Sequence, residues 1–355
     1  MCVAFIAALV TCFIVPPDAE YISYLDLRTL ALLYCLMVVV AGLRTADMFS
    51  LLAHRLCEKT KTVRSMGITL VALSFVSSML ITNDVALLTF VPFAVVVLSM
   101  AHQERELIWV VVLQTVAANL GSVLTPVGNP QNLYLYSRYD MSIGEFFSAT
   151  LPLWGLALAL VLLLCLRLPK NGVDVFLGEE PELDRRTLWL YLALFALCLL
   201  VVLRVLSWPV MLIILVIVLL FTDRTRLKSA DFMLLLSFVC FFVFAGNLAR
   251  IESVAGLLGS ILAGREMLTG ALTSQVISNV PAALLLSGFT DNGRELLLGV
   301  NIGGLGTPVA SLASLISLKF YSHSEHASMA KYMKTFLLMN AALLIFLLVL
   351  FSTVL

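Results

Sequence analysis

The chain has 355 residues, of which 61% are hydrophobic and only 12% are charged. Its mean hydropathy is +1.05, far above that of a water-soluble globular domain, so the composition predicts a polytopic protein embedded in a lipid bilayer. The 22 basic and 22 acidic residues cancel, which gives no reason to expect a nucleic-acid partner.

Apolar windows of about the 20 residues that cross a bilayer recur along the chain. The first lacks a basic leader and a small-residue cleavage pattern before Pro16, so it is expected to be retained rather than removed as a signal peptide. Residues 44–57 fit either a helix lying at the membrane interface or a loop. We expect plain membrane helices at 1–15, 27–43, 145–168, 187–203, 207–222, 229–249 and 335–354.

Two segments in the first half are not plain helices. Segment 65–100 would measure about 54 Å as one straight helix, too long for one span, and polar residues interrupt its middle at Thr82-Asn83-Asp84. We predict a re-entrant hairpin with these three residues at its tip. Segment 107–137 begins apolar and then contains glycines, prolines and asparagines that no continuous helix accepts. It is predicted to be an interrupted membrane helix.

The second half repeats this order. A second hairpin is predicted at 266–289, around Ser278-Asn279, and a second interrupted helix at 296–320. Each interrupted helix carries the triplet Thr-Pro-Val, at 125–127 and at 307–309. Prolines and polar residues at bilayer depth are stable only where the freed backbone groups line a cavity or meet protein partners. The four breaks are therefore expected to surround one central site.

The fold class that these segments predict is an all-α polytopic membrane protein built from two inverted-topology repeats. The first repeat is expected at 1–168 and the second at 187–355, joined by a cytoplasmic linker at 169–186. If each hairpin returns to the side from which it enters, the loops at 44–64, 101–106, 169–186, 223–228 and 319–334, with Arg167 at a helix end, share one side and hold 16 of the 22 basic residues. Because cytoplasmic loops carry the excess of lysine and arginine, this side is expected to be the cytoplasm, and the two hairpins then enter from opposite faces. We expect a plasma or inner membrane protein with the loops 169–186 and 319–334 in the cytoplasm.

The breaks carry groups of both polarities. A carboxylate such as Asp84 costs about 2.5 to 3.5 kcal/mol at the bilayer centre, so it is interpreted as a ligand for a cation or proton, or as a cap on the second half of the hairpin. Hydroxyl and amide groups at the two hairpin tips stand at helix N-termini, which favour anions. Unwound carbonyls near 121–128 and 303–307 could coordinate Na+. The alternative is that these asparagines and threonines merely cap helix breaks.

The remaining sequence patterns do not indicate a catalytic or metal site. The seven cysteines show no C-x-x-C spacing and are expected to be packing residues. Acidic residues at 179–184 are interpreted as part of a solvated linker. His323 and His326 have no third ligand nearby, so no metal site is expected there. Neither H-E-x-x-H nor G-x-S-x-G occurs, and no second deep aspartate is found, so an intramembrane hydrolase is not expected.

The stretches from Ala118-Asn119-Leu120-Gly121 to Asn132 and from Gly299 to Leu318 resemble the ion transporter superfamily. This superfamily contains citrate transporter-like permeases, sodium/dicarboxylate symporters, arsenite and antimonite efflux permeases and certain Na+/H+ antiporters. The resemblance implies a homodimer in which two hairpins and two interrupted helices hold substrate and Na+, without a resident cofactor. One departure is that the tips read Thr-Asn-Asp and Ser-Asn-Val, where sodium/dicarboxylate symporters resemble Ser-Asn-Thr at both.

Residue by residue, two candidate sets follow. The candidate coupling-ion residues, at which Na+ could also bind, are Asn83, Asp84, Gly128, Asn132, Asn279, Asn301 and Gly306. The candidate substrate-binding residues are Thr82, Asn83, Thr125, Pro126, Asn129, Ser278, Asn279, Thr307, Pro308 and Ser311.

No lysine or arginine lies deep in the four broken segments, so a bound anion would depend on helix ends and on a co-bound cation. We therefore expect a secondary active transporter that moves a small anion, either citrate-like or dicarboxylate-like or an inorganic oxyanion, coupled to Na+ or H+ by alternating access. The alternatives are an arsenite or antimonite efflux permease or a Na+/H+ antiporter of the same fold, and a passive channel.

Overall fold

The computed structural model describes residues 2–173, 179–325 and 327–354. Within these ranges the chain is helical, with eighteen α-helices, three short 3-10 turns and one isolated bridge between Thr62 and Gly172. Eight of the helices are long and apolar enough to cross a membrane. The linker residues 174–178 and the predicted loop residue His326 lie outside the described residues.

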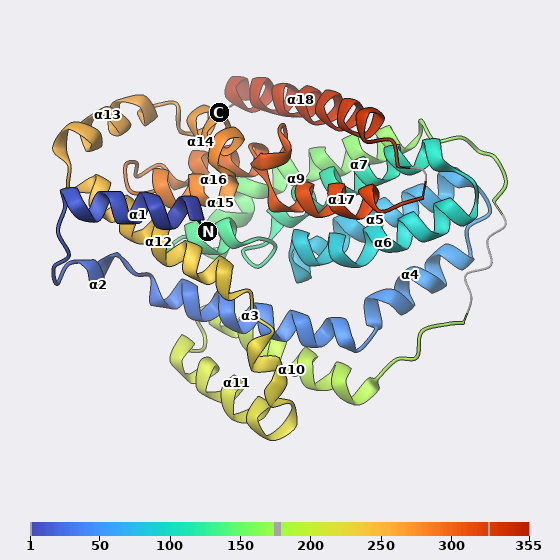
Figure 1. Ribbon diagram of the computed structural model, residues 1–355, viewed down its shortest axis with the longest axis horizontal. Coiled ribbons are helices and arrows are strands. Elements are labelled where there is room, and N and C mark those ends of the chain that lie inside the picture. The colour runs from blue at the N-terminus through green and yellow to red at the C-terminus, as the bar shows by residue number, and fades with distance from the viewer. Residues whose placement is uncertain (1, 174–178, 326, 355) are drawn as a thin grey trace.

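Figure 1 shows the helices coloured in chain order and labels most of them. The 3-10 turns are η1 (Ser122–Leu124), η2 (Arg224–Lys228) and η3 (Pro308–Ala310). The α-helices are α1 (Cys2–Ile14), α2 (Tyr21–Tyr24), α3 (Leu27–Thr45), α4 (Met48–Glu58), α5 (Val63–Ile81), α6 (Asn83–Met100), α7 (Glu104–Gly121), α8 (Pro130–Arg138), α9 (Ile143–Cys165), α10 (Arg185–Val202), α11 (Trp208–Thr222), α12 (Phe232–Ala249), α13 (Glu252–Leu262), α14 (Glu266–Ile277), α15 (Asn279–Leu286), α16 (Gly293–Ile302), α17 (Leu312–Ser322) and α18 (Met329–Val354).

Most predicted helices are confirmed to within a few residues, and each of the four broken segments is divided where the polar residues occur. The stretch 44–57 contains a helix, α4, rather than a loop. Helix α18 begins at Met329, six residues before the expected start, and α2 and α13 were not predicted. The six cysteines whose side chains the structure describes are all free, and five of them are buried.

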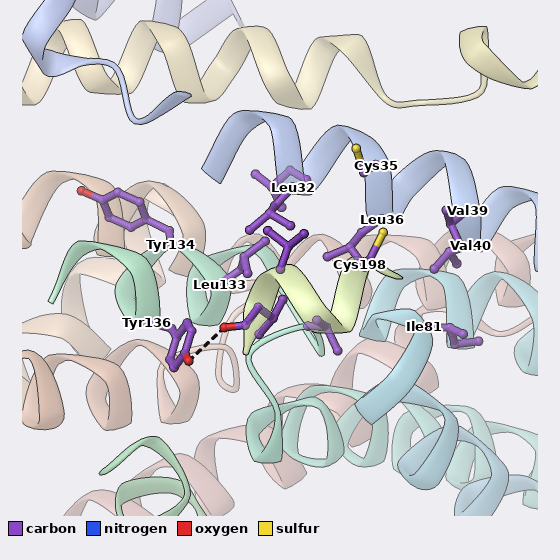
Figure 2. Packing of buried hydrophobic residues seen from close by; sticks show 14 of the residues in the cluster. Leu32, Cys35, Leu36, Val39, Val40, Ile81, Leu133, Tyr134, Tyr136 and Cys198 are labelled. Carbon is purple, nitrogen blue, oxygen red and sulfur yellow. Dashed lines mark hydrogen bonds between the residues drawn. The ribbon is translucent and has the colours of Figure 1, made fainter. Parts of the chain in front are cut away.

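Two large apolar cores hold the bundle together. The first lies where α3 and α10 pack on α8, and Figure 2 shows Leu36 and Cys35 of α3 near Cys198 of α10 and Leu133 of α8. Tyr136 adds a polar anchor here, because its hydroxyl donates to the Val202 carbonyl at 3.0 Å. The second core joins α5, α6 and α7 to α9, α17 and α18. Close van der Waals packing of these side chains stabilises the helix contacts, because lipid tails are as apolar as the core and burial alone gives little advantage.

The outer helices present large apolar side chains away from both cores. Phe13 of α1 is 82% exposed and Phe221 of α11 is 88% exposed. Water would not stabilise such a surface, whereas the hydrocarbon of a bilayer would. Together with the eight candidate spans, this surface is that of a multi-pass membrane protein.

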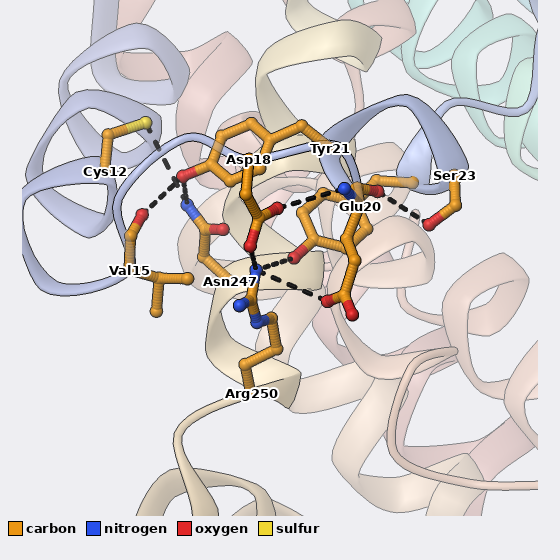
Figure 3. Close-up of polar contacts among 9 residues, drawn as sticks. Cys12, Val15, Asp18, Glu20, Tyr21, Ser23, Asn247 and Arg250 are labelled. Carbon is orange, nitrogen blue, oxygen red and sulfur yellow. Dashed lines mark hydrogen bonds and ion pairs between the residues drawn. The ribbon is translucent and has the colours of Figure 1, made fainter.

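A polar cluster fastens the N-terminal helices to the end of α12, as Figure 3 shows. The Arg250 guanidinium pairs with Asp18 at 2.8 Å and with Glu20 at 3.4 Å. Asn247, which is fully buried, donates to the hydroxyl of Tyr21 at 2.9 Å. These contacts hold α1 along α12, and that packing places the first turns of α1 beside the pocket described below.

Candidate functional site

The two predicted hairpin tips have the same backbone geometry. A single residue separates α5 from α6 and another separates α14 from α15: Thr82 has φ 73° and ψ 151°, and Ser278 has φ 75° and ψ 154°. This region is almost confined to glycine, and a residue with a side chain that occupies it stores about 1–3 kcal/mol of strain. Such strain at two matching positions, on two different sequences, points to a functional requirement.

The asparagine that follows each tip makes the same hydrogen bond in both halves. The Asn83 side-chain oxygen accepts the Asp84 backbone N–H at 2.9 Å, and the Asn279 oxygen accepts the Val280 N–H at the same distance. Each asparagine thereby satisfies one backbone donor of the first turn of its helix, while its amide nitrogen remains available to other groups.

The two Thr-Pro-Val triplets attach the interrupted helices to these tips. The Thr125 hydroxyl donates to the Met79 carbonyl at 2.5 Å, and the Thr307 hydroxyl donates to the Gln275 carbonyl at 3.1 Å. Each of these carbonyls belongs to the residue three positions before its tip. Both threonines therefore attach their interruption to the helix that precedes its tip, and they do so in the same way.

Two glycines allow the helices to come close at equivalent places. A Cβ atom on Gly121 would lie 2.2 Å from the Phe75 carbonyl oxygen and 2.7 Å from the Ser78 hydroxyl. On Gly303 it would lie 2.8 Å from the hydroxyl of Ser274. Ser78 and Ser274 each lie four residues before a tip, so the interrupted helix of each half packs on its own tip through a glycine and a serine.

The interruptions themselves are held by amide side chains. Asn132 is fully buried and donates to the carbonyls of Ser122 at 3.2 Å, Val123 at 3.2 Å and Thr125 at 3.1 Å. In the second half Gln275 donates to the carbonyls of Gly303 at 2.8 Å and Leu305 at 3.0 Å. Several of the unwound carbonyls expected to coordinate Na+ thus accept amide hydrogens.

Two further predicted glycines serve these bends. A Cβ on Gly128 would lie 2.1 Å from the Ser122 carbonyl oxygen, and the Gly128 carbonyl accepts the Asn83 N–H at 3.1 Å. Gly306 has φ +100°, a conformation that favours glycine, and a Cβ there would lie 2.2 Å from the Gln275 side-chain oxygen. Both glycines therefore permit a backbone path that no larger residue could follow without movement.

Buried asparagines join the two halves of the chain. We call Asn83, Asn119, Asn129, Asn132 and Asn301 the asparagine cluster; each is at most 4% exposed. Asn129 donates to the side-chain oxygen of Asn301 at 3.1 Å, and Asn301 donates to that of Asn132 at 2.6 Å. A buried network with its donors and acceptors matched fixes relative positions, because an unmatched polar group is costly.

Asn119 is the central member of this cluster on the tip side. Its side-chain oxygen accepts the Asn83 amide at 3.0 Å and the Ser311 hydroxyl at 2.9 Å. Its amide donates to the Gly304 carbonyl at 3.3 Å. One side chain thus connects the first tip, the second interruption and the start of α17.

Four helices begin, and α14 ends, at one pocket of about 560 Å³. The pocket is walled by the aromatic side chains of α12 and by alanines of α1. The helices that begin there are α6, α8, α15 and α17, and their first residues line it: Asn83 and Asp84, Pro130 and Gln131, Ser278 and Asn279, Ser311 and Leu312. Each helix N-terminus carries a partial positive charge and backbone N–H donors, which favour an anion beside these four helix starts without a basic side chain.

Asp84 is the only ionisable side chain among the described residues that line this pocket. It is half-buried, and no basic group in the described ranges lies within ion-pair distance of it. It also lines a second pocket of about 710 Å³, which extends past Thr82 and Asn129 to Arg44, Asp47, Arg226 and Asp231. Asp84 therefore lies between a site formed by helix ends and a wider, charged vestibule.

The structure brings some of the sequence-predicted residues to these pockets and leaves others behind them. Thr125, Pro126, Gly128, Asn132, Asn301, Gly306, Thr307 and Pro308 line neither pocket. Thr82, Asn83, Asp84, Asn129, Ser278, Asn279 and Ser311 line one or both.

Sequence reasoning missed three amides, Asn119, Gln131 and Gln275. Asn119 could have been found from the repeat, because it precedes Thr125 by six residues as Asn301 precedes Thr307. Gln131 follows Pro130, the first residue of α8, and lies within the stretch from Ala118 to Asn132 that carries the family resemblance. Gln275 has no such signal, since its role depends on the backbone path at Gly306.

Comparison with known proteins gives a consistent picture. Residues 1–291 match the family described as Citrate transporter. The transporter MJ0456 of Methanocaldococcus jannaschii is 32% identical, with 84% of this chain and 82% of that protein aligned. The inner membrane protein YbiR of Escherichia coli is 32% identical, with 83% of this chain and 80% of that protein aligned. A silicon efflux transporter of rice, LSI3, is 34% identical over 43% of this chain and 31% of its own length. The chain is therefore a member of the citrate transporter family, a multi-pass membrane transporter and not an enzyme.

Proposed function

We propose that the protein is a secondary active transporter that moves a small anion, either a citrate-like or dicarboxylate-like carboxylate or an inorganic oxyanion, coupled to Na+ or H+. The observation that carries the proposal is the pocket at which four helices begin, lined by Asn83, Ser278, Asn279 and Ser311. Backbone N–H groups and amide side chains can bind carboxylate or oxyanion oxygens there, with Thr82 and Asn129 on the adjoining side.

The coupling cation in this proposal binds beside Asp84. The pocket offers no basic side chain among its described residues, so a bound anion gains from a cation held nearby. Asp84 supplies a carboxylate, and Asn83 and Asn279 supply amide oxygens. Asn132, Asn301, Gly128 and Gly306 line neither pocket; in this proposal they shape the interruptions beside the cation site, and Thr125, Pro126, Thr307 and Pro308 fix those interruptions to the tips.

Transport in this proposal follows alternating access between two inverted-topology repeats with re-entrant tips, in a homodimer. The equal backbone angles at Thr82 and Ser278 support a duplicated site. The placement of 16 of 22 basic residues on one side supports opposite orientations of the halves. In this topology the loops at 169–186 and 319–334 are cytoplasmic, and the vestibule beside Arg44 and Arg226 opens to the cytoplasm.

A second candidate is favoured by the isolation of Asp84. A carboxylate without a cationic partner in a half-buried pocket is suited to exchanging a cation or proton. The relatives include a silicon efflux transporter of rice and a putative transporter arsB of Dictyostelium discoideum, 27% identical over 44% of this chain and 28% of that protein. Efflux of a neutral hydroxide such as arsenite, or Na+/H+ antiport, would use the same residues.

Transport by purified protein in proteoliposomes tests the proposal. We expect concentrative uptake of at least one of citrate, succinate and sulfate under an inward Na+ or proton gradient, and loss of uptake when an ionophore collapses the gradient. Equilibration without concentration would indicate a passive channel. If no anion moves under any gradient while arsenite or cations do, the second candidate replaces the first.

Asp84→Asn separates the two candidates. In an anion symporter the variant should still bind the anion but should lose the pH or Na+ dependence of transport. In an antiporter or hydroxide efflux carrier it should lose exchange altogether. Asp47→Asn is the matched control, because Asp47 lines only the vestibule and has φ 56°, which asparagine tolerates. It should leave coupling unchanged.

A further inference from the structure

A third pocket, of about 490 Å³, lies apart from the transport site and shares no residue with the two pockets described above. It is formed where α7 begins, α9 ends and α18 begins. Four of its lining side chains are basic, namely Arg105, Arg167, Lys331 and Lys334, and Glu106 is the only acidic one. We call it the basic pocket.

The basic side chains of this pocket are not used by the fold. None of the four forms an ion pair within the described ranges, and all four residues are exposed. Arg167 lies over the Trp109 ring at 4.6 Å from its centroid, and the Trp109 indole N–H donates to the Leu164 carbonyl at 3.2 Å. The stacked ring holds one cation at the pocket while leaving its charge uncompensated.

The surroundings of the basic pocket indicate that its ligand extends into the membrane. It lies at the ends of α7, α9 and α18, each of which is long and apolar enough to cross a bilayer. Next to Arg167, Leu166 is 51% exposed and Leu163 is 63% exposed; one turn beyond Lys334, Leu338 is 64% exposed. A free anion would use only the charged mouth, whereas a phospholipid would cover both the charges and these leucines.

We propose that the basic pocket binds the phosphate headgroup of an anionic phospholipid whose acyl chains lie along α9 and α18. Basic pockets between membrane helices at the interface are suited to such headgroups. Bound there, the lipid would neutralise charges contributed by three helices and hold α18 against α7, with which it packs. The site is independent of the proposed transport reaction and of its substrate.

The test uses full-length protein purified in a neutral detergent, with its melting temperature measured against three probes. Phosphatidylglycerol should raise the melting temperature, phosphatidylcholine with the same acyl chains should not, and inorganic phosphate at equal phosphate concentration should not. Equal effects of the two lipids, or an effect of inorganic phosphate that matches phosphatidylglycerol, would overturn the proposal, the latter in favour of a small-anion site.

Variants locate the effect. The double change Lys331→Gln/Lys334→Gln affects exposed side chains and should weaken the apparent affinity for phosphatidylglycerol at least fivefold. Lys59→Gln/Lys61→Gln removes the same charge from exposed positions outside the pocket and should leave it unchanged. Native mass spectrometry of Arg105→Gln provides a readout independent of melting, and full retention of bound phosphatidylglycerol in both pocket variants would contradict the proposal.

Discussion

The change Asn119→Leu isolates the contribution of the asparagine cluster, because leucine has a similar volume but no hydrogen-bonding group. It removes the bonds from Asn83 at 3.0 Å and Ser311 at 2.9 Å, and the bond to the Gly304 carbonyl at 3.3 Å. The two donors line the proposed transport pocket, so water can partly replace their partner. The Gly304 carbonyl is buried and loses its partner more completely.

The expected cost follows from these three contacts. Hydrogen bonds between membrane helices average about 0.6 kcal/mol in double-mutant cycles, because the unfolded chain in the membrane also finds partners. Three such bonds give a loss of about 2 kcal/mol in the free energy of unfolding. Because the lost bonds orient Asn83 and Ser311 in the pocket, anion binding should weaken as well.

The control is Asn340→Leu in α18. The Asn340 side chain is equally buried, but its amide donates only within its own helix, to Phe336 at 2.9 Å, and its oxygen has no partner in the described residues. Replacing it removes an unsatisfied acceptor, so the control should be near neutral. Unfolding of both variants in detergent micelles, together with anion uptake in proteoliposomes, provides the comparison. Equal stability and equal uptake of the two variants would refute the assigned role of Asn119.

Two further expectations concern packing and charge. Gly121→Ala places a methyl group 2.2 Å from the Phe75 carbonyl oxygen and should destabilise the protein by about 1–3 kcal/mol. The control Gly155→Ala, whose added methyl group has nothing within 4 Å, should be neutral or stabilising by up to about 1 kcal/mol. Equal melting temperatures of the two variants would contradict the close approach of Gly121 to Phe75. In the loop after α11, hydrogen bonding to the Thr225 hydroxyl lowers the pKa of Asp223 below its usual 3.8, so its stabilisation is present above that pH and is lost as the pH falls through the lowered value. The melting-temperature difference from Asp223→Asn should therefore be constant above about pH 5 and shrink below about pH 4, and a difference independent of pH would contradict it.

The positions of the helices could be predicted because the bilayer imposes a simple rule on the sequence. Apolar runs of sufficient length become helices, and glycine, proline and asparagine mark the breaks, as at Thr82 and Ser278. Helix α13 was missed because its eleven residues fall short of a membrane span. The sequence showed polar residues at the helix starts. It did not show that four of these helices begin at the same pocket.

The sequence predicted some of the residues that line the pockets, but not the contacts that the others make. Repeated threonines, prolines and asparagines indicated a duplicated site, and Thr82, Asn83 and Ser278 do line the pockets. The two Thr-Pro-Val threonines instead donate to backbone carbonyls behind the tips. Local sequence cannot separate these roles, because the direction of a side chain in an interrupted helix depends on backbone angles set by distant contacts.

Stabilisation of the purified protein by small anions tests the central claim most directly, since a ligand raises the melting temperature of the state it binds. We expect at least one of citrate, succinate and sulfate to stabilise the wild type, more strongly with Na+ or at a lower pH. Ser237→Phe adds a ring to the pocket wall at a residue whose hydroxyl bonds only to the Met233 carbonyl of its own helix, and it should abolish that stabilisation. A wild type that no anion stabilises, or a variant that responds like the wild type, would contradict an anion site at the meeting point of the four helices.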